Sequence, residues 1–427
     1  MALTQICRNK LSKFDYWYIF ILSIYFGGAV KETLGLFYFT GFISVGIPFV
    51  MTLYLYIKKH IILTDVFFKT ILFFVIWLLF QYIVNGYFNI VDFSFYIYNI
   101  FIAYILIRYY GKNLFYLFEN AIYILSFISL VFWLICLCGG QQLLTSLAPF
   151  NGTGLSDASY GIYTIMRPSD DSLYILYRNA GFASEPGHFS GLVCFAIFFN
   201  LLINNFNLKN KHFYVLLITL LSTQSTTGYM IFCCAIIPFY LYNVRSNKTK
   251  YLMLPIIIIV VYNLYTSPVI SEKLDSTSAS EEMRDKVISY ANKNSDYKLV
   301  LQRFDSFVVE MQNFVHDPII GYGKWNYSFF YQNITTNIGV SNAIGTLFAK
   351  YGFIIAILYL FFLTKSSKRI IELYGKKGWL FLYLMVLGFM FSYDHEARCY
   401  ILFFTLFSLF YKREKLQMIK NNNVIRE

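Results

Sequence analysis

Three short clusters of polar residues interrupt long apolar runs in this sequence, and they hold the side chains that could do chemistry. An arginine, a glutamate and a histidine lie close together at Arg178, Glu185 and His188. Residues 222–228 mostly bear hydroxyl groups, and residues 392–398 contain four ionisable side chains. An arginine fork binds phosphate oxygens through parallel hydrogen bonds. Carboxylates and imidazoles serve as general bases. The residue types therefore suit anion binding combined with proton transfer.

The first cluster opens an apolar run and also fits an ordinary helix start. Proline is favoured in the first helical turn, and a nearby acidic residue interacts favourably with the helix dipole. These preferences explain Glu185-Pro186. They do not explain why Arg178, Glu185 and His188 occur together at the start of one apolar run. Gly181 lies between Arg178 and Glu185, so a turn could bring both side chains to one cavity wall. We take Glu185 as a candidate catalytic residue and Arg178 and His188 as candidate binding residues.

The second cluster divides the apolar stretch 213–244, which has basic residues at both ends. The chain must therefore enter the membrane there and return. The first arm, 213–221, makes only ~15 Å of helix, which is about half of the ~30 Å bilayer core. We expect turn 222–228 to be recessed and to line a cavity, with Ser225 as a candidate binding residue. The alternative is an ordinary short loop beside a tilted helix.

The third cluster lies on a hairpin between the last two apolar runs. Because the hairpin is short, its charges are costly unless they are paired or used. We take His395 and Glu396 as candidate catalytic residues and Arg398 as a candidate binding residue. Mutual ion pairing in a plain turn is the alternative.

A single lysine, Lys350, lies well inside the tenth apolar run. Long basic side chains near a helix end can extend to the membrane surface. Lys350 therefore either reaches outward or lines the same cavity as a candidate binding residue.

The composition of the chain indicates that these clusters belong to a membrane protein. Of its 427 residues, 58% are hydrophobic, 21% are aromatic and only 14% are charged, and the mean hydropathy is +0.54. Soluble domains have about a quarter charged residues. One spanning helix takes ~20 mostly apolar residues, so the chain has enough apolar residues for roughly twelve spanning helices. We predict an all-α polytopic membrane protein, and we exclude a soluble enzyme, a coiled coil, a disordered tail and a nucleic-acid-binding domain.

Twelve apolar runs are the expected spans. They lie at about 16–30, 34–57, 67–84, 93–107, 114–138, 189–206, 213–221, 229–244, 251–266, 342–364, 379–391 and 399–411. Alternate connecting segments hold most of the 35 basic residues and few of the 23 acidic ones. By the positive-inside rule, both termini are therefore cytoplasmic. The topology predicts a multi-pass membrane protein.

Two connecting segments are long, and both are expected on the periplasmic side. The expected divisions are a five-span region 1–138, a periplasmic segment 139–187, spans six to nine at 188–266, a periplasmic segment 267–341 and a three-span region with a tail at 342–427. No internal similarity of two halves is visible, although many transporters show one.

The second long segment contains an expected amphipathic helix at 296–317. Its apolar residues recur at three- and four-residue steps, and Pro318 would end it. Its polar side carries Arg303, Glu310 and Asn313, and we expect Glu310 and Asn313 to be reachable from water. Such a helix could lie on the outer membrane surface or roof a cavity. Arg303 is a further candidate binding residue.

The cysteines and histidines predict no metal site. The seven cysteines lack the spacing of zinc ligands, and no pair of histidines has it either. Cysteines in apolar runs commonly serve as packing residues, and His60 and His212 are expected on the surface of cytoplasmic loops. With no glycine-rich phosphate loop, we expect no cofactor and no nucleotide site.

The order of these motifs resembles a known family. The motifs are Arg178…Gly181-Phe182…Glu185-Pro186…Phe189, then Leu221-Ser222-Thr223…Ser225, then Arg303, Pro318…Gly321-Tyr322-Gly323, and Asn342…Tyr351-Gly352. They are similar to those of Wzy-type polymerases of polysaccharide repeat units, which are grouped with the O-antigen ligases. The resemblance covers roughly Arg178 to Arg398, and the first five spans match only in hydropathy.

The resemblance implies a GT-C-like membrane glycosyltransferase of the bacterial inner membrane, working at the periplasmic face. Such enzymes move a growing glycan from undecaprenyl diphosphate onto an incoming lipid-linked repeat unit, which yields O-antigen or a related polysaccharide. Arg178, Arg303 and Arg398 would meet the charge on the leaving diphosphate, and a carboxylate or histidine would take the proton. The implied partners are undecaprenyl-diphosphate-linked oligosaccharides, with a chain-length regulator and a flippase of the same pathway.

Two alternatives remain beside the polymerase. Related ligases, which transfer glycan to lipid A core, carry a histidine just before the asparagine that opens the later span. Here Ser341 precedes Asn342, which favours a polymerase. A flippase of lipid-linked glycans should have two matching halves and charges along its central spans, whereas the charges here cluster at the expected outer face.

Overall fold

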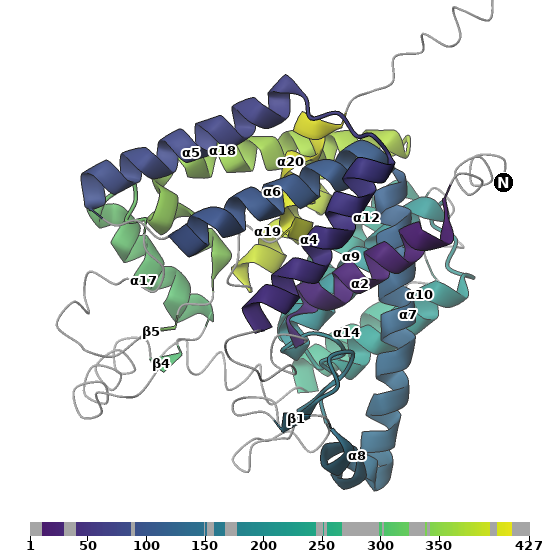
Figure 1. Cartoon of the computed structure of the whole chain (residues 1–427). Coiled ribbons are helices and arrows are strands. Elements are labelled where there is room, and N and C mark those ends of the chain that lie inside the picture. The colour runs from purple at the N-terminus through teal and green to yellow at the C-terminus, as the bar shows by residue number, and fades with distance from the viewer. Residues whose placement is uncertain are drawn as a thin grey trace, which may run out of the picture.

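The computed structural model describes most of the chain and is mainly helical (Figure 1). The described residues are 11–29, 40–86, 90–148, 150–151, 158–166, 177–244, 251, 254–266, 299–300, 303–323, 338–339, 342–392 and 399–411. All strands within these ranges are only two residues long.

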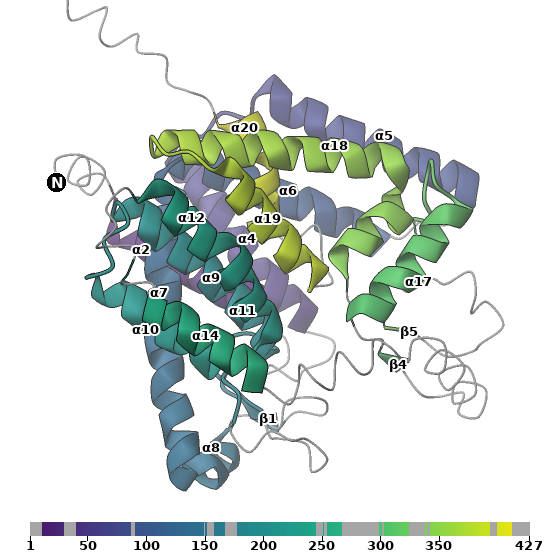
Figure 2. The ribbon, with the colours of Figure 1, turned by 180° about the vertical axis from the view of Figure 1, so that it is seen from behind.

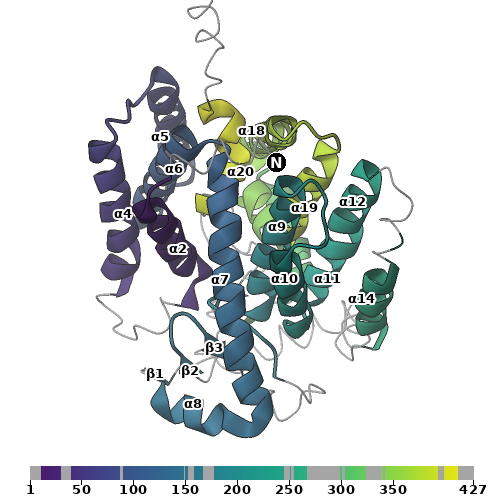
Figure 3. The ribbon, with the colours of Figure 1, turned by 90° about the vertical axis from the view of Figure 1, so that its right-hand side faces the viewer.

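Helix α7 (Asn113–Ile135) stands between two groups of helices (Figure 3). One group is α2 (Lys13–Gly27), α4 (Thr40–Lys58), α5 (Asp65–Asn85) and α6 (Ile90–Tyr110). The other is α9 (Pro186–Ile203), α10 (Lys211–Ser222), α11 (Thr226–Ile231), η2 (Phe232–Ile236), α12 (Ile237–Asn243) and α14 (Leu254–Thr266). The last three helices, α18 (Ala343–Leu373), α19 (Trp379–Phe391) and α20 (Cys399–Phe410), contact both groups.

Each expected apolar run overlaps a helix of the described residues, but the helices differ in length. Four are long and apolar enough to cross a membrane: Asp65–Asn85, Asn113–Leu147, Pro186–Ile203 and Ala343–Leu373. Helices α10, α19 and α20 have 12, 13 and 12 residues, or ~18–20 Å. Each is shorter than the ~30 Å hydrocarbon core. The fold is thus that of a mostly helical protein with several membrane-compatible helices.

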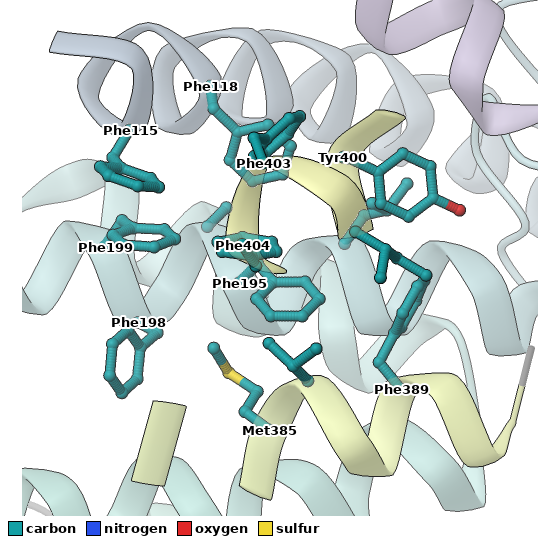
Figure 4. Close-up of a cluster of buried hydrophobic side chains, with 14 of the residues drawn as sticks. Phe115, Phe118, Phe195, Phe198, Phe199, Met385, Phe389, Tyr400, Phe403 and Phe404 are labelled. Atoms are coloured by element: carbon teal, nitrogen blue, oxygen red, sulfur yellow. The ribbon is translucent and has the colours of Figure 1, made fainter. Parts of the chain in front are cut away.

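The core is built from stacked aromatic rings around α9 (Figure 4). Phe199 of α9 stacks on Phe115 of α7, at 4.5 Å between ring centroids, and on Phe404 of α20, at 5.9 Å. Phe195 stacks on Phe404 at 4.6 Å. Offset aromatic pairs add attraction beyond the area they bury. Helix α9 is the most buried of the four long apolar helices, so the residues of its first turn are held by an enclosed helix.

Helix α18 is broken at Gly352, whose φ of 74° and ψ of 176° are accessible to glycine alone. The turn after α17 (Arg303–His316) fits into the break. The Phe353 N–H donates to the Pro318 carbonyl at 2.7 Å, and a Cβ at Gly352 would lie 2.2 Å from the Ile319 carbonyl oxygen. The proline turn and the glycine break are therefore one joint between two elements.

The expected external segments contain small ordered elements. After α7 come η1 (Cys136–Gly140), α8 (Gln141–Leu147) and an antiparallel sheet of β1 (Phe150–Asn151), β2 (Ala158–Ser159) and β3 (Thr164–Ile165). Before α18, β4 (Leu299–Val300) pairs in parallel with β5 (Ile338–Gly339). The expected helix 296–317 was therefore wrong at its start, because the chain at 299–300 is extended and the described helix begins at Arg303.

The orientation of α17 also differs from the expectation. Glu310 and Asn313 are only 5% and 1% exposed, whereas Val315 is 73% exposed. Glycine at position 345 of α18 makes room for the carboxylate side chain: a Cβ there would lie 2.8 Å from the Cβ of Glu310. Thr346 then donates to Glu310 Oε1 at 3.4 Å. Helix α17 packs on α18 (Figure 2), and the expectation that Glu310 and Asn313 are reachable from water was wrong.

Candidate functional site

Glu185 and Arg303 form an ion pair between segments that are far apart in the sequence. The distance from Arg303 Nη2 to Glu185 Oε1 is 2.5 Å, and the two side chains are 31% and 29% exposed. Glu185 is the N-cap residue of α9, but its side chain makes no capping hydrogen bond to that helix. Helix capping therefore explains the backbone position of Glu185 and not the use of its carboxylate.

The segment before α9 is held from three sides. The Thr164 N–H of β3 donates to the Gly181 carbonyl at 2.8 Å, and the Asn179 N–H donates to the Ser222 carbonyl at 3.0 Å. Ala183 forms an antiparallel bridge with the residue after α2. Backbone hydrogen bonds to three separate elements thus restrict how the chain can enter α9, and they place Glu185 at its start.

Two glycines allow this close packing. Gly181 has a φ of +54°, and a Cβ there would lie 2.5 Å from the Phe189 ring. The Phe182 ring fills the space beside Gly27, where a Cβ would meet it at 2.3 Å. Any larger residue at either position would push the segment away from α2 or α9. The Gly181-Phe182 pair is therefore the local reason for the geometry at Glu185.

Arg178 lies on the same segment but against a different neighbour. Its Nε donates to the Thr223 carbonyl at 3.3 Å, and its side chain is half-buried. The sequence led us to expect Arg178 and Glu185 on one cavity wall, yet the carboxylate contacts Arg303. A partner more than a hundred residues away in sequence cannot be read from local spacing.

The polar turn 222–228 is buried under that segment. Ser222, Thr223 and Ser225 are at most 4% exposed. Asn179 donates its side-chain amide to Ser222 Oγ at 2.9 Å. Ser225 Oγ accepts from the Gly228 N–H at 3.4 Å and caps α11. The turn is therefore an internal support for residues 177–185, and the ligand-binding role of Ser225 stays a prediction.

His188 and Lys350 both point into the protein. His188 is 1% exposed, and its Nε2 lies 2.9 Å from the Tyr400 hydroxyl. Lys350 is 2% exposed and donates from Nζ to the Tyr96 hydroxyl at 3.1 Å. Of the two interpretations of Lys350, the one in which its side chain reaches outward was wrong. Lys350 lies about 12 Å along α18 from Asn342, the residue that caps the start of that helix.

The remaining candidates, His395, Glu396 and Arg398, lie outside the described residues. The chain before them is held at Ser392, whose Oγ lies 2.9 Å from Thr227 Oγ1. Their expected roles stay predictions.

Asn342 is a central residue of the site that sequence reasoning used only as part of a motif. It is fully buried, and its Oδ1 accepts from the Gly345 N–H at 2.9 Å to cap α18. Its Nδ2 donates to the Phe391 carbonyl at 2.9 Å and to the Arg303 carbonyl at 3.3 Å. Asparagine opening an apolar run is a recognisable capping signal, but the two bonds that join α17, α18 and α19 are not visible in the sequence.

A second acidic site, at Glu119 of α7, was missed. Its Oε1 accepts from Asn200 Nδ2 at 2.8 Å and lies 3.0 Å from His212 Nδ1. The His212 ring stacks on Tyr123 at 3.7 Å between centroids. His212 is therefore a packed residue in the first turn of α10, and the expectation of a surface histidine in a loop was wrong.

No protein-family model, curated protein or solved structure gives a significant match to the chain. Function is therefore inferred from the residues and their geometry. Within the described ranges, no group of three or more His, Cys, Asp or Glu side chains could hold a metal ion. The half-buried Glu185–Arg303 pair, with Arg178 on the segment that leads to it, can bind an anion and accept a proton.

Proposed function

We propose that this protein is a membrane glycosyltransferase that polymerises undecaprenyl-diphosphate-linked oligosaccharide repeat units into O-antigen or a related surface polysaccharide. The observation that carries the proposal is the Glu185–Arg303 ion pair. It joins two separate motifs through which the sequence resembles Wzy-type polymerases. The resemblance supplies the substrate class, and the pair supplies a carboxylate and a guanidinium that are both accessible.

The proposed reaction is the attack of an acceptor sugar hydroxyl on the anomeric carbon of the donor glycan. The new C–O bond forms as the bond from that carbon to the diphosphate oxygen breaks. Negative charge then develops on the leaving undecaprenyl diphosphate, where Arg303 and Arg178 stabilise it. Glu185 receives the proton of the attacking hydroxyl. The donor is already activated, so the reaction needs no nucleotide.

The proposed arrangement in the membrane has about twelve spans, a GT-C-like architecture and cytoplasmic termini, with the site at the periplasmic face. Helix α2 supports this orientation. It begins at Lys13, in the basic N-terminal region. It ends at Gly27, whose carbonyl accepts from the Ser184 N–H at 3.2 Å. Glu185 is thus at the end of α2 opposite the positive charges, as a periplasmic site requires under the positive-inside rule.

The surface glycan of a strain that lacks this protein tests the proposal. We expect glycan with a single repeat unit, and we expect long chains again when the wild-type gene is restored. Unligated long polymer would instead indicate a ligase, and lipid-linked repeats held on the cytoplasmic side would indicate a flippase. Either of these outcomes contradicts the proposal.

A further inference from the structure

A long apolar cavity lies away from the Glu185–Arg303 pair, between α5, α6, α18 and α20. Its volume is about 430 Å³. Along α5 it extends from Val66 to Phe74, or ~12 Å of helix. One leaflet of a bilayer core is ~15 Å thick, so the cavity can hold most of the length of one hydrocarbon chain from a single leaflet.

The cavity opens where the protein meets lipid. Helix α5 is long and apolar enough to span a membrane, and only 11% of its apolar window is buried. Val66 and Phe73, which line the cavity, are 39% and 47% exposed. In a membrane, hydrocarbon chains have direct access to such an opening.

The two ends of the cavity differ chemically. Tyr96 and Tyr351 line one end, and Tyr351 donates a hydrogen bond to the Tyr96 hydroxyl. The other end lies at the start of α5, where Lys69 is exposed. Among the described residues that line the cavity, Lys69 alone carries a charge. A ligand that matches this surface has an apolar chain and an anionic group at the Lys69 end.

We propose that the cavity binds one acyl chain of an anionic phospholipid, whose phosphate contacts Lys69. The leaflet is the one that faces the Lys58–Lys59 end of α4, which is expected to be cytoplasmic. Lysines at that surface attract anionic headgroups. The site is separate from the proposed polymerase chemistry, because the phospholipid is neither donor nor acceptor.

Native mass spectrometry of the full chain tests this site, after release from nanodiscs of phosphatidylglycerol and phosphatidylcholine in equal amounts. We expect the wild-type protein to retain phosphatidylglycerol in preference to phosphatidylcholine. Lys69→Gln should lower that preference about fivefold, and Lys69→Arg should restore it. Lys58→Gln is the matched control, because Lys58 is exposed at the same end but donates to Tyr54 and does not line the cavity.

Leu406→Trp separates the cavity from the surface charge, since it fills the cavity from α20 and leaves Lys69 in place. Loss of retained phosphatidylglycerol in this variant, at a wild-type elution volume, supports the proposal. Equal retention of both phospholipids by the wild-type protein would overturn it, as would unchanged preference in Lys69→Gln. Preferential retention of added undecaprenyl phosphate over phosphatidylglycerol would also overturn it, by assigning the cavity to the polyprenyl chain.

Discussion

Two carboxylates in this protein bind basic side chains from other elements, and their surroundings are opposite. Glu119 is 3% exposed at its side chain and lies against His212, with Asn200 donating to the same oxygen. Glu185 is 29% exposed and lies against Arg303, which is 31% exposed. The first group is enclosed by α7, α9 and α10, whereas the second is at the junction of α9 and α17.

The difference in exposure indicates that Glu119 has a structural role, whereas Glu185 belongs to a candidate site. Removing an acceptor from an enclosed cluster leaves buried donors unsatisfied, which costs stability. A partly exposed ion pair contributes only about 0–1 kcal/mol. The small contribution of the pair to stability therefore does not explain why several elements hold Glu185 in place. Its accessibility fits a group that meets a ligand.

The largest expected effect is on activity at the exposed pair. Glu185→Gln keeps the shape of the side chain but removes its basicity, so polymer formation should fall roughly a hundredfold or more. Arg303→Lys keeps the charge but loses the guanidinium fork, and we expect a strong loss there too. Gel analysis of surface glycan at equal protein levels measures both.

Matched controls share the residue type but lie away from the pair. Asp317→Asn changes a carboxylate beyond the end of α17, and Arg369→Lys changes an arginine whose guanidinium lies 5.6 Å from the Tyr411 ring centroid. Both controls should make normal polymer. Long polymer from Glu185→Gln at normal levels would remove Glu185 from the chemistry.

The enclosed carboxylate should show the reverse behaviour. Glu119→Ala leaves Asn200 and His212 without their acceptor, so we expect about 2–3 kcal/mol of lost stability. Polymer formation per folded molecule should be retained. The midpoint of unfolding in detergent measures this, with Glu372→Ala on the exposed side of α18 as control. A wild-type midpoint for Glu119→Ala would remove the contrast between the two carboxylates.

Asn342 connects the site to its support and should have an intermediate effect. Asn342→Ala loses the α18 cap and two donated bonds, which we expect to cost about 1–2 kcal/mol. Asn342→Asp keeps the acceptor for Gly345 but cannot donate to the Arg303 carbonyl. The aspartate variant should therefore recover part of the stability but not the polymerisation activity. Full activity in both variants would contradict a positioning role.

The smallest expected effect is the stability change at the exposed pair itself. Glu185→Ala should lower the free energy of unfolding by no more than about 1 kcal/mol, measured by the same unfolding experiment as Glu119→Ala. A larger loss would make Glu185 a structural residue like Glu119.

The helices were predictable from the sequence because a membrane requires long apolar runs. The short arm before turn 222–228 also followed from residue counts, and α10 ends at Ser222. The orientation of α17 did not follow, since its polar residues suit either water or a polar partner. Glu310 can pack on a polar partner in α18 because the glycine at position 345 leaves room for its side chain.

The candidate site was predictable by residue and not by pairing. Arg178 and Glu185 appear out of place beside an apolar run, and Arg303 lies on an expected amphipathic helix. Both are local signals. That Glu185 contacts Arg303, while Arg178 contacts the Thr223 carbonyl, depends on how α9 and α17 meet. The same holds for Glu119 and His212, which lie on different helices and show no shared motif.

Donor binding and turnover, measured together on purified protein in nanodiscs, test the central claim most directly. The donor is an undecaprenyl-diphosphate-linked repeat unit, and Asp317→Asn is the control. We predict that Arg303→Lys weakens donor binding. Glu185→Gln should bind the donor with near wild-type affinity, but its turnover should be roughly a hundredfold or more below that of the wild type. Wild-type turnover by Glu185→Gln at equal amounts of folded protein would contradict the account.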